Sequence, residues 1–244
     1  MKITLMQALY MKDSYLKEFE ATVTKVTDGK FVVLDQTAFY PNSGGQPHDT
    51  GKMTRLSDGA VFNVVYVGKF GGDISHEIQN VDPAELKEGD AVRCEIDWER
   101  RYRFMRYHTA SHIISGLINE KTGALITGNQ IDLERSRIDF SLEDYDPSRM
   151  NDFIREASEK AAEGTQVEIS FITKEEAEKT EGLSKLAKGL PPGIKEIRIV
   201  DIVGIDKQAD GGTHVKNTSE IGKIELVKCE NKGKNNRRVY FTLK

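Results

Sequence analysis

The chain contains little cysteine and no long apolar stretch. Its 244 residues include two cysteines, Cys94 and Cys229, which lie far apart and form no CxxC pair. A disulfide framework is therefore not expected, and a reducing, cytoplasmic location fits best. Both cysteines are flanked by alternating apolar residues and are predicted to be buried in strands. No apolar run approaches the roughly 20 residues of a membrane-spanning helix, so no membrane partner is expected.

An excess of positive charge is also missing. The chain has 35 Lys and Arg against 39 Asp and Glu, a formal net charge of −4. This balance gives no overall attraction to nucleic acid, so any binding of a polyanion must come from local basic patches. Hydrophobic residues make up 38% of the chain, enough for a folded protein with a core.

Short strands separated by turn residues dominate the first 95 residues. Glu20–Thr27 alternates with period two, and Asp28-Gly29 is a turn signal before Phe31–Leu34. Two further β-branched runs, Val61–Val67 and Ala91–Ile96, each follow a turn that contains glycine. This pattern predicts a small β-barrel or sandwich.

The pattern changes at Asp97. Trp98–Thr122 is predicted to be one helix, with Asp97 as its N-cap and Gly123 just after its end. Two shorter helices are predicted at Pro147–Gly164 and Thr173–Lys179. Strands are predicted at Ala124–Asp132, Arg137–Ser141, Thr165–Ile172, Ile197–Ile205, Ile221–Cys229 and Arg237–Thr242. The predicted fold is α+β, with a β-barrel domain at residues 1–95 and an α+β domain at residues 96–244.

Histidine is scarce as well, yet three of the five histidines fall into two pairs with one spacing. His108 and His112 are four residues apart on the predicted helix, so their Cβ atoms lie roughly 5–6 Å apart on one face. Asp210 and His214 repeat the spacing around Gly211-Gly212, which permits a tight turn. A lone pair is usually two polar residues on a helix face, or a hairpin turn. Together, the two pairs predict one roughly four-coordinate metal site.

The donor set favours one Zn²⁺ ion. Imidazole nitrogens suit zinc, and the Asp210 oxygen extends the choice toward other divalent ions. An alternative places Asp210 just outside the coordination sphere and leaves a position for water. The metal can either position a substrate or activate water, and the sequence does not decide between these roles.

Two stretches resemble a known family. His108-Thr-Ala-Ser-His112, followed by Gln208-Ala-Asp-Gly-Gly-Thr-His214, resembles the editing domain of alanyl-tRNA synthetases and the free-standing alanyl-tRNA editing proteins of the AlaX family. That family's pattern is HxxxH followed by CxxxH, and this chain has Asp210 where cysteine is usual. Leu34–Gly51 is similar to the glycine-rich stretch of the medium-length AlaX proteins. On its own, this stretch is a loop in which Gly44 and Gly45 permit positive φ.

The resemblance implies an aminoacyl-tRNA deacylase. Such an enzyme hydrolyses the ester of a wrong amino acid, chiefly serine and as a second candidate glycine, on alanine-accepting tRNA. The chain is too short for a full synthetase and has no ATP-binding segment, so the free-standing, ATP-independent medium form is expected. In the family, the segment of Thr127, Asn129 and Gln130 lines the amino-acid pocket. The implied fold is a small N-terminal β-barrel followed by a synthetase-type editing domain.

Local basic residues are candidates for holding the mischarged tRNA. Of the arginines before the histidine pair, Arg103 and Arg106 are the better candidates, and Arg100 and Arg101 the weaker ones. Gly44 and Gly45 belong to a loop expected near the active site or the RNA end. A second basic cluster follows near the C-terminus: Lys228, Lys232, Lys234, Arg237 and Arg238.

The other two histidines lie outside the predicted metal site, and two rival functions are compatible with the sequence. His48 lies in the glycine-rich stretch near the expected substrate, and His76 is predicted to be exposed at a strand end. One rival function is a hydrolase of another ester or amide with the same metal ligands. The other is an RNA-binding module with a structural metal and no catalysis.

Overall fold

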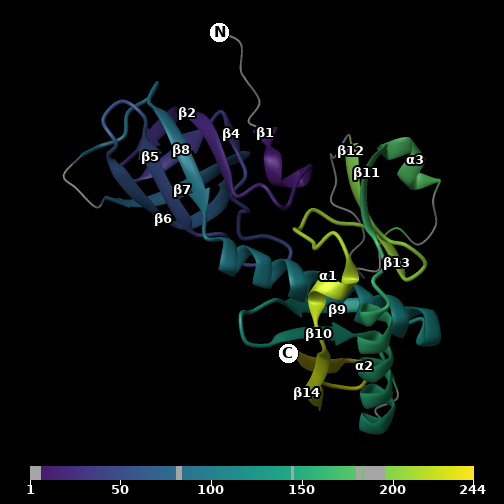
Figure 1. Cartoon of the computed structure of the whole chain (residues 1–244). Helices are drawn as coiled ribbons and strands as arrows, with labels where there is room; N and C mark the ends of the chain where they lie inside the picture. The colour runs from purple at the N-terminus through teal and green to yellow at the C-terminus, as the bar shows by residue number, and fades with distance from the viewer. Residues whose placement is uncertain (1–6, 81–83, 144–145, 180–182, 184–195) are drawn as a thin grey trace. The chain divides into compact units, whose positions relative to one another are not determined.

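The computed structural model describes residues 7–80, 84–143, 146–179, 183 and 196–244 (Figure 1). The chain divides into two compact units, Met1–Arg103 and Phe104–Lys244. The division falls within the longest helix, α1 (Trp98–Thr122). The domain boundary predicted near residue 95 stays a prediction. None of the described helices combines the length and apolar character that crossing a bilayer requires.

Six strands close into a barrel in the first unit, as predicted. They follow one another around the barrel in the order β2-β3-β7-β6-β5-β8. Their bounds are β2 Glu18–Thr27, β3 Phe31–Leu34, β5 Gly51–Arg55, β6 Val61–Phe70, β7 Asp73–Asn80 and β8 Ala91–Ile96. Two short strands, β1 (Gln7–Ala8) and β4 (Gln36–Thr37), pair in parallel beside it, with a 3-10 turn at Leu9–Met11.

Alternation along the strands fills the barrel. Phe19, Ala21 and Val23 of β2 are buried, whereas the residues between them are exposed. Between β2 and β3, Asp28 and Gly29 have φ values of 51° and 66°, which suit the right-handed twist of a tight hairpin. The predicted turn is thus confirmed in its place and its chemistry.

One prediction in the barrel is wrong. His76 on β7 is fully buried, not exposed at a strand end. Its Nδ1 lies 2.9 Å from the Val32 carbonyl oxygen and its Nε2 lies 2.9 Å from Thr37 Oγ1. These two partners come from β3 and β4, so the burial depends on strand pairing that the local sequence does not reveal. Cys94 is buried as predicted, whereas Cys229 is only half-buried, and both are free thiols.

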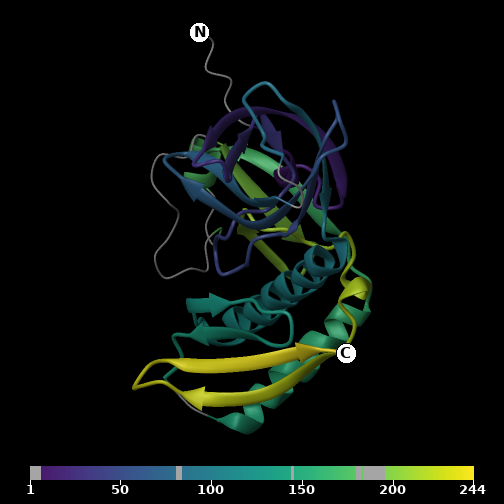
Figure 2. The same cartoon turned by 90° about the vertical axis from the view of Figure 1, so that its left-hand side faces the viewer.

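The second unit contains two antiparallel sheets. A four-stranded sheet has the order β14-β15-β10-β9, and a three-stranded sheet has the order β11-β12-β13. In both Figure 1 and Figure 2, α1 lies between these sheets. The strand bounds are β9 Ile126–Gln130, β10 Ser136–Phe140, β11 Val167–Thr173, β12 Glu196–Ile202, β13 Asp206–Ala209, β14 Ile224–Asn231 and β15 Arg237–Leu243.

Helix α1 has the predicted bounds, and the two shorter helices end one or two residues before their predicted ends. The N–H of Arg100 donates to Asp97 Oδ1 at 3.2 Å, so Asp97 caps α1. After its end, Gly123 has φ 71° and donates to the Asn119 carbonyl oxygen at 2.7 Å. Helix α2 (Pro147–Ala162) is capped by the Asp146 side chain, and α3 (Lys174–Glu178) begins with the predicted capping box of Thr173 and Glu176. A 3-10 turn, η2, spans Thr218–Ile221.

Candidate metal centre

The four predicted ligands lie together in the second unit. His108 and His112 come from α1, and Asp210 and His214 come from the turn after β13. The candidate donor atoms of these side chains all lie within 4.8 Å of one another. The three histidines are only 4%, 6% and 3% exposed, so water reaches them poorly. The two pairs seen in the sequence therefore meet in one cluster.

Glycines allow the segments to approach this closely. A side chain at Gly212 would overlap the His108 ring and stand 3.0 Å from Asp210 Oδ2, so only glycine fits there. On α1, a Cβ at Gly116 would lie 2.9 Å from the Ile205 carbonyl oxygen and 3.0 Å from Asp206 Cβ. Gly116 thus lets the start of β13 pack against the helix.

A carboxylate behind His112 fixes its orientation. His112 Nδ1 lies 2.9 Å from Asp206 Oδ2, and the Gln208 amide donates to the same oxygen at 2.6 Å. The Asp206 carboxylate accepts from Nδ1–H, so Nε2 is the nitrogen that His112 would present to a metal. Sequence reasoning missed this residue. The signal was alternation: Asp206, Gln208 and Asp210 are two residues apart, which places their side chains on one face of an extended segment.

A threonine does the same for His214. Thr109 Oγ1 donates to the Met105 carbonyl oxygen at 3.0 Å and lies 3.2 Å from His214 Nδ1. Since a hydroxyl has a single proton, Thr109 accepts from Nδ1–H, so Nε2 is the nitrogen that His214 would present to a metal. That nitrogen faces Asp210 Oδ2 at 3.0 Å. Both histidines are therefore held in the tautomer that binds a metal through Nε2.

The charge state of the cluster suits a divalent cation. Burial lowers the pKa of His108 to about 4, and burial together with the neighbouring His108 holds the pKa of His214 well below its usual range. Burial alone would raise the pKa of Asp210, but the facing imidazoles outweigh it and the pKa falls well below its usual value. At neutral pH, His108 and His214 are neutral and Asp210 is ionised. Ligands in this state need release no proton when a metal binds.

The donor set fits zinc. Three imidazoles and one carboxylate make up a four-ligand set, and Zn²⁺ binds nitrogen and carboxylate oxygen in tetrahedral sites. Asp210 is also held by the protein, because its Oδ2 accepts from the Gly212 N–H at 2.5 Å and its carbonyl oxygen accepts from Arg198 at 2.9 Å. The same set can hold other divalent ions of similar size.

Comparison with known proteins identifies the family. Residues 5–100 match the model described as tRNA synthetases class II (A), and residues 197–240 match the Threonyl and Alanyl tRNA synthetase second additional domain. The chain is 56% identical over 239 residues to the alanyl-tRNA editing protein AlaX-M of Methanosarcina barkeri (strain Fusaro / DSM 804), across 97% of this chain and 98% of the relative.

The chain belongs to the AlaX-M family of alanyl-tRNA editing proteins.

A second member, from Saccharolobus solfataricus, is 47% identical over 98% of this chain and 99% of its own length. The alanine–tRNA ligase of Methanobrevibacter smithii is 39% identical over 91% of this chain, which corresponds to 25% of the ligase. The resemblance noted from the two histidine-containing motifs is thus confirmed. The matches extend over nearly the whole chain of each AlaX-M relative.

The predicted amino-acid pocket residues of this AlaX-M member lie on β9. Thr127 Oγ1 donates to Asn236 Oδ1 at 3.1 Å, and Gln130 Oε1 accepts from Arg137 Nε at 3.2 Å. Asn129 pairs with Ile138 across the sheet. These contacts lie in the four-stranded sheet and in the turn between β14 and β15, and the three residues are not part of the four-residue cluster. Their role in a substrate pocket stays a prediction.

The predicted tRNA contacts are placed differently from one another. Arg103 is exposed on α1, while Arg106 donates from Nε and Nη2 to the Ile221 carbonyl oxygen at 3.0 and 2.7 Å. Gly44 and Gly45 have φ values of 60° and 88°, as their predicted loop requires. Contacts of these four residues with RNA stay predictions.

Arg101 cannot act as a surface phosphate contact. It is fully buried and ion-paired with the fully buried Asp49, and it also donates to the Ser14 and Ala38 carbonyl oxygens. Asp49 in turn accepts from the Tyr40 N–H at 2.6 Å. The pair therefore anchors the glycine-rich stretch inside the first unit. Arg237 of the C-terminal cluster is also buried.

Proposed function

We propose that this chain edits mischarged tRNA in trans by hydrolysing the ester of Ser-tRNA(Ala), with Gly-tRNA(Ala) as a second candidate substrate. The supporting observation is the convergence of four metal-ligand side chains, the three histidines buried and Asp210 half-buried, in a member of a family named for alanyl-tRNA editing. The chain is accordingly an aminoacyl-tRNA deacylase. Mischarged tRNA(Ala) is its partner.

The need for such an enzyme follows from the small chemical difference between serine and alanine. Serine is alanine with one added hydroxyl, and a hydrophobic pocket rejects an added hydroxyl by only about 10²-fold in comparable synthetases. A second site that favours the hydroxyl removes the error after charging. Such a site must discriminate on the amino acid and act on the ester.

In the proposed mechanism, His108, His112, Asp210 and His214 hold one Zn²⁺ ion. When bound, the ion supplies Lewis-acid chemistry, either to orient the serine hydroxyl or amine or to activate a water molecule. Asp206 and Thr109 hold two of the imidazoles in the binding tautomer, and burial keeps competing water away. These residues pre-organise the site before substrate arrives.

The substrate contacts are part of the same proposal. Thr127, Asn129 and Gln130 are proposed to line the pocket for the amino acid. Arg103 and Arg106, with Gly44 and Gly45, are proposed to contact the tRNA. Arg103 has the exposure that a phosphate contact needs, and Arg106 keeps Nη1 outside its two bonds with Ile221.

The test is a deacylation assay with three substrates. Purified protein is incubated with Ser-, Gly- and Ala-tRNA(Ala), and the released amino acid is measured. We expect Ser-tRNA(Ala) to be hydrolysed at least tenfold faster than Ala-tRNA(Ala). The variant His108→Ala/His112→Ala should lose the activity, whereas Arg155→Ala on the exposed side of α2 serves as the control.

Two results would argue for the rivals. Bound zinc without turnover on any charged tRNA would favour an RNA-binding module with a structural metal. The histidine-rich donor set already argues against that function, because structural zinc sites are usually rich in cysteine. Full activity in the double variant would show that hydrolysis does not use this cluster.

A further inference from the structure

The outer face of the four-stranded sheet carries a row of polar side chains. Across β10 and β15, Asp139 lies opposite Arg238 and Arg137 lies opposite Tyr240. Across β9 and β10, Gln130 lies opposite Arg137. Directly opposed residues on antiparallel strands point to the same face, so these five side chains share one side of the sheet.

The other face of the same strands belongs to the core. Ile138, Phe140, Val239 and Phe241 alternate with the polar residues and are at most 1% exposed. Helix α2 packs near the edge strand on that side, where Ser158 Oγ accepts from the Ile224 N–H at 3.0 Å. The polar row is therefore an outward surface of a rigid sheet, not a frayed end.

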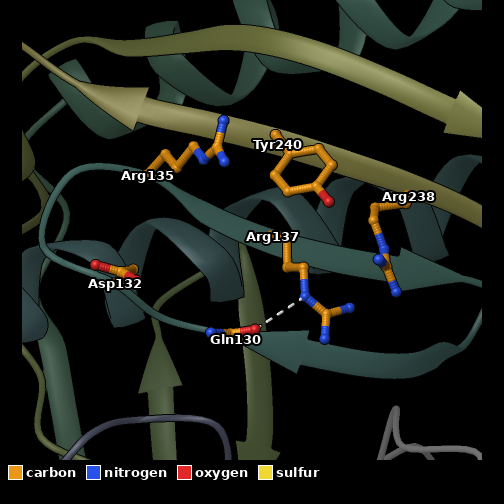
Figure 3. A pocket seen from close by; sticks show the side chains of 6 residues that line it. All are labelled: Gln130, Asp132, Arg135, Arg137, Arg238 and Tyr240. Atoms are coloured by element: carbon orange, nitrogen blue, oxygen red, sulfur yellow. Dashed lines mark hydrogen bonds between the residues drawn. The ribbon is translucent and has the colours of Figure 1, made fainter.

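This surface contains a pocket. Its lining residues are Gln130, Asp132, Arg135, Arg137, Arg238 and Tyr240 (Figure 3). The volume is about 330 Å³, at the lower end of the roughly 300–1,000 Å³ of small-ligand sites. It is lined almost entirely by polar and cationic groups, so it suits a small anion better than an apolar ligand.

A buried carboxylate beneath the pocket orients two of its arginines. Asp139 is 6% exposed and accepts from Arg238 Nε at 2.7 Å, from Arg238 Nη2 at 2.8 Å and from Arg137 Nη1 at 2.9 Å. Arg137 Nε is directed to Gln130 at 3.2 Å. The bonds described for Arg137 leave its Nη2 to serve as a donor, whereas Arg238 also hydrogen-bonds to the Tyr240 side chain.

The third arginine has no carboxylate of its own among the described residues. Arg135 is exposed, and its Cζ lies 5.4 Å from the centre of the Tyr240 ring. Lys228 lies over the same ring, with Nζ 4.7 Å from its centre. Three arginines against Asp132 and Asp139 leave a formal surplus of one positive charge. In a chain of net charge −4, this is a local patch of the kind that binding a polyanion needs.

We propose that this pocket binds a phosphate group of the tRNA backbone, an inference that rests on the proposed function for its ligand. Guanidinium groups offer pairs of N–H donors that match phosphate oxygens, and a carboxylate that holds them in place lowers the cost of ordering them. Tyr240 stands between the arginines, where its hydroxyl adds a neutral donor (Figure 3). The site specifies position on the RNA and reads no base.

Arg135 is the residue to change. Substitution of Arg137 or Arg238 would leave the buried Asp139 short of a partner and endanger the fold. Arg135 is exposed, so Arg135→Ala and Arg135→Glu should leave the melting temperature close to that of the wild type. Arg155→Ala in α2 is the matched control, because it removes the same charge from an exposed position of the same unit.

The experiment measures the Kd for uncharged tRNA(Ala) over a series of KCl concentrations. We expect Arg135→Ala to weaken binding by roughly tenfold at low salt and to reduce the slope of log K against log salt by about 1. Arg135→Glu should weaken binding further, and Arg155→Ala should match the wild type. Inorganic phosphate, added at constant ionic strength, should compete with tRNA more weakly in Arg135→Ala than in the wild type.

The outcomes separate the pocket from the proposed function. If both Arg135 variants keep the wild-type affinity for tRNA(Ala) and the wild-type salt slope, the pocket does not bind a tRNA phosphate. This conclusion would hold even if the wild type hydrolyses Ser-tRNA(Ala). Binding of inorganic phosphate alone, with no effect on tRNA, would overturn it as well. Binding of tRNA that depends on Arg135, in a protein that hydrolyses no charged tRNA, would support the pocket and refute the deacylase.

Discussion

The metal site depends on which nitrogen each histidine presents. Asp206 and Thr109 each engage an Nδ1, so His112 and His214 turn their Nε2 atoms toward Asp210 and His108. Thr109 lies between His108 and His112 and Asp206 lies just before the second stretch, but neither is a residue that the HxxxH and CxxxH pattern fixes. Affinity for the metal therefore depends on Asp206 and Thr109, which hold the ligands in place but are not ligands themselves.

Replacement of Asp206 should weaken zinc binding in a graded way. Asp206→Ala removes both the acceptor and the charge behind His112, and we expect about a 10- to 100-fold loss of zinc affinity. Asp206→Asn keeps an acceptor oxygen and should lose less. Competition with a chromophoric chelator measures the affinity directly. Asp152→Asn, exposed on α2, is the control, and equal affinities for all four proteins would refute the role of Asp206.

His76 should make stability depend on pH. Burial lowers its pKa to about 4 in the folded chain, against 6.5 for an ordinary histidine. As the pH falls, His76 therefore binds a proton near pH 6.5 in the unfolded chain but only near pH 4 in the folded chain. The free energy of unfolding decreases as the pH falls across this window. At pH 5 the loss amounts to about 2 kcal/mol.

Urea denaturation of the wild type and His76→Gln at pH 7.5 and pH 5 measures this effect. The glutamine keeps a donor and an acceptor in the buried position but does not titrate. We expect the wild type to lose about 2 kcal/mol more than the variant between the two pH values. An equal loss in the two proteins would show that His76 does not carry the dependence.

Helix α1 connects the metal-ligand cluster to the segment that supports it. It carries two ligands on one face and has its single glycine four residues after His112. That glycine lies against the Ile205 carbonyl oxygen and Asp206. Close packing of the helix on β13 is thus what brings the carboxylate to His112.

Gly116→Ala should weaken the site despite the better helix propensity of alanine. Propensity alone would favour alanine by about 1 kcal/mol. The new methyl would stand 2.9 Å from a backbone oxygen, so β13 must shift and carry Asp206 away from His112. We expect lower thermal stability and reduced zinc affinity. A variant that is more stable and binds zinc as the wild type does would contradict this packing argument.

Several elements could be predicted from the sequence because their signals are local. Trp98–Thr122, Phe31–Leu34 and Ala91–Ile96 have the bounds predicted for them, since caps, turns and alternation mark their ends. The strands β5, β7 and β13 were missed because each is rich in polar residues. The convergence of the two ligand pairs followed from spacing and resemblance. The Arg101–Asp49 pair and the pocket around Arg135 depend on register between distant strands, which no local pattern encodes.

For the whole molecule, a chain with net charge −4 must bind a polyanion through a few placed cations. Affinity for tRNA should therefore fall steeply with salt. With three phosphate contacts, an increase from 50 to 200 mM KCl should weaken binding by about 10- to 100-fold. Filter binding or fluorescence anisotropy across this range measures the slope. An affinity that does not change with salt would exclude phosphate contacts as the source of binding.

The most direct measurement of the central claim is deacylation of Ser-tRNA(Ala) by the wild type before and after removal of metal. Dialysis against a chelator should abolish hydrolysis, and one equivalent of Zn²⁺ per chain should restore it. The variant His108→Ala/His112→Ala should neither bind that equivalent nor recover activity. Hydrolysis that continues at the full rate in the metal-free protein would contradict a catalytic role for the His108, His112, Asp210 and His214 cluster.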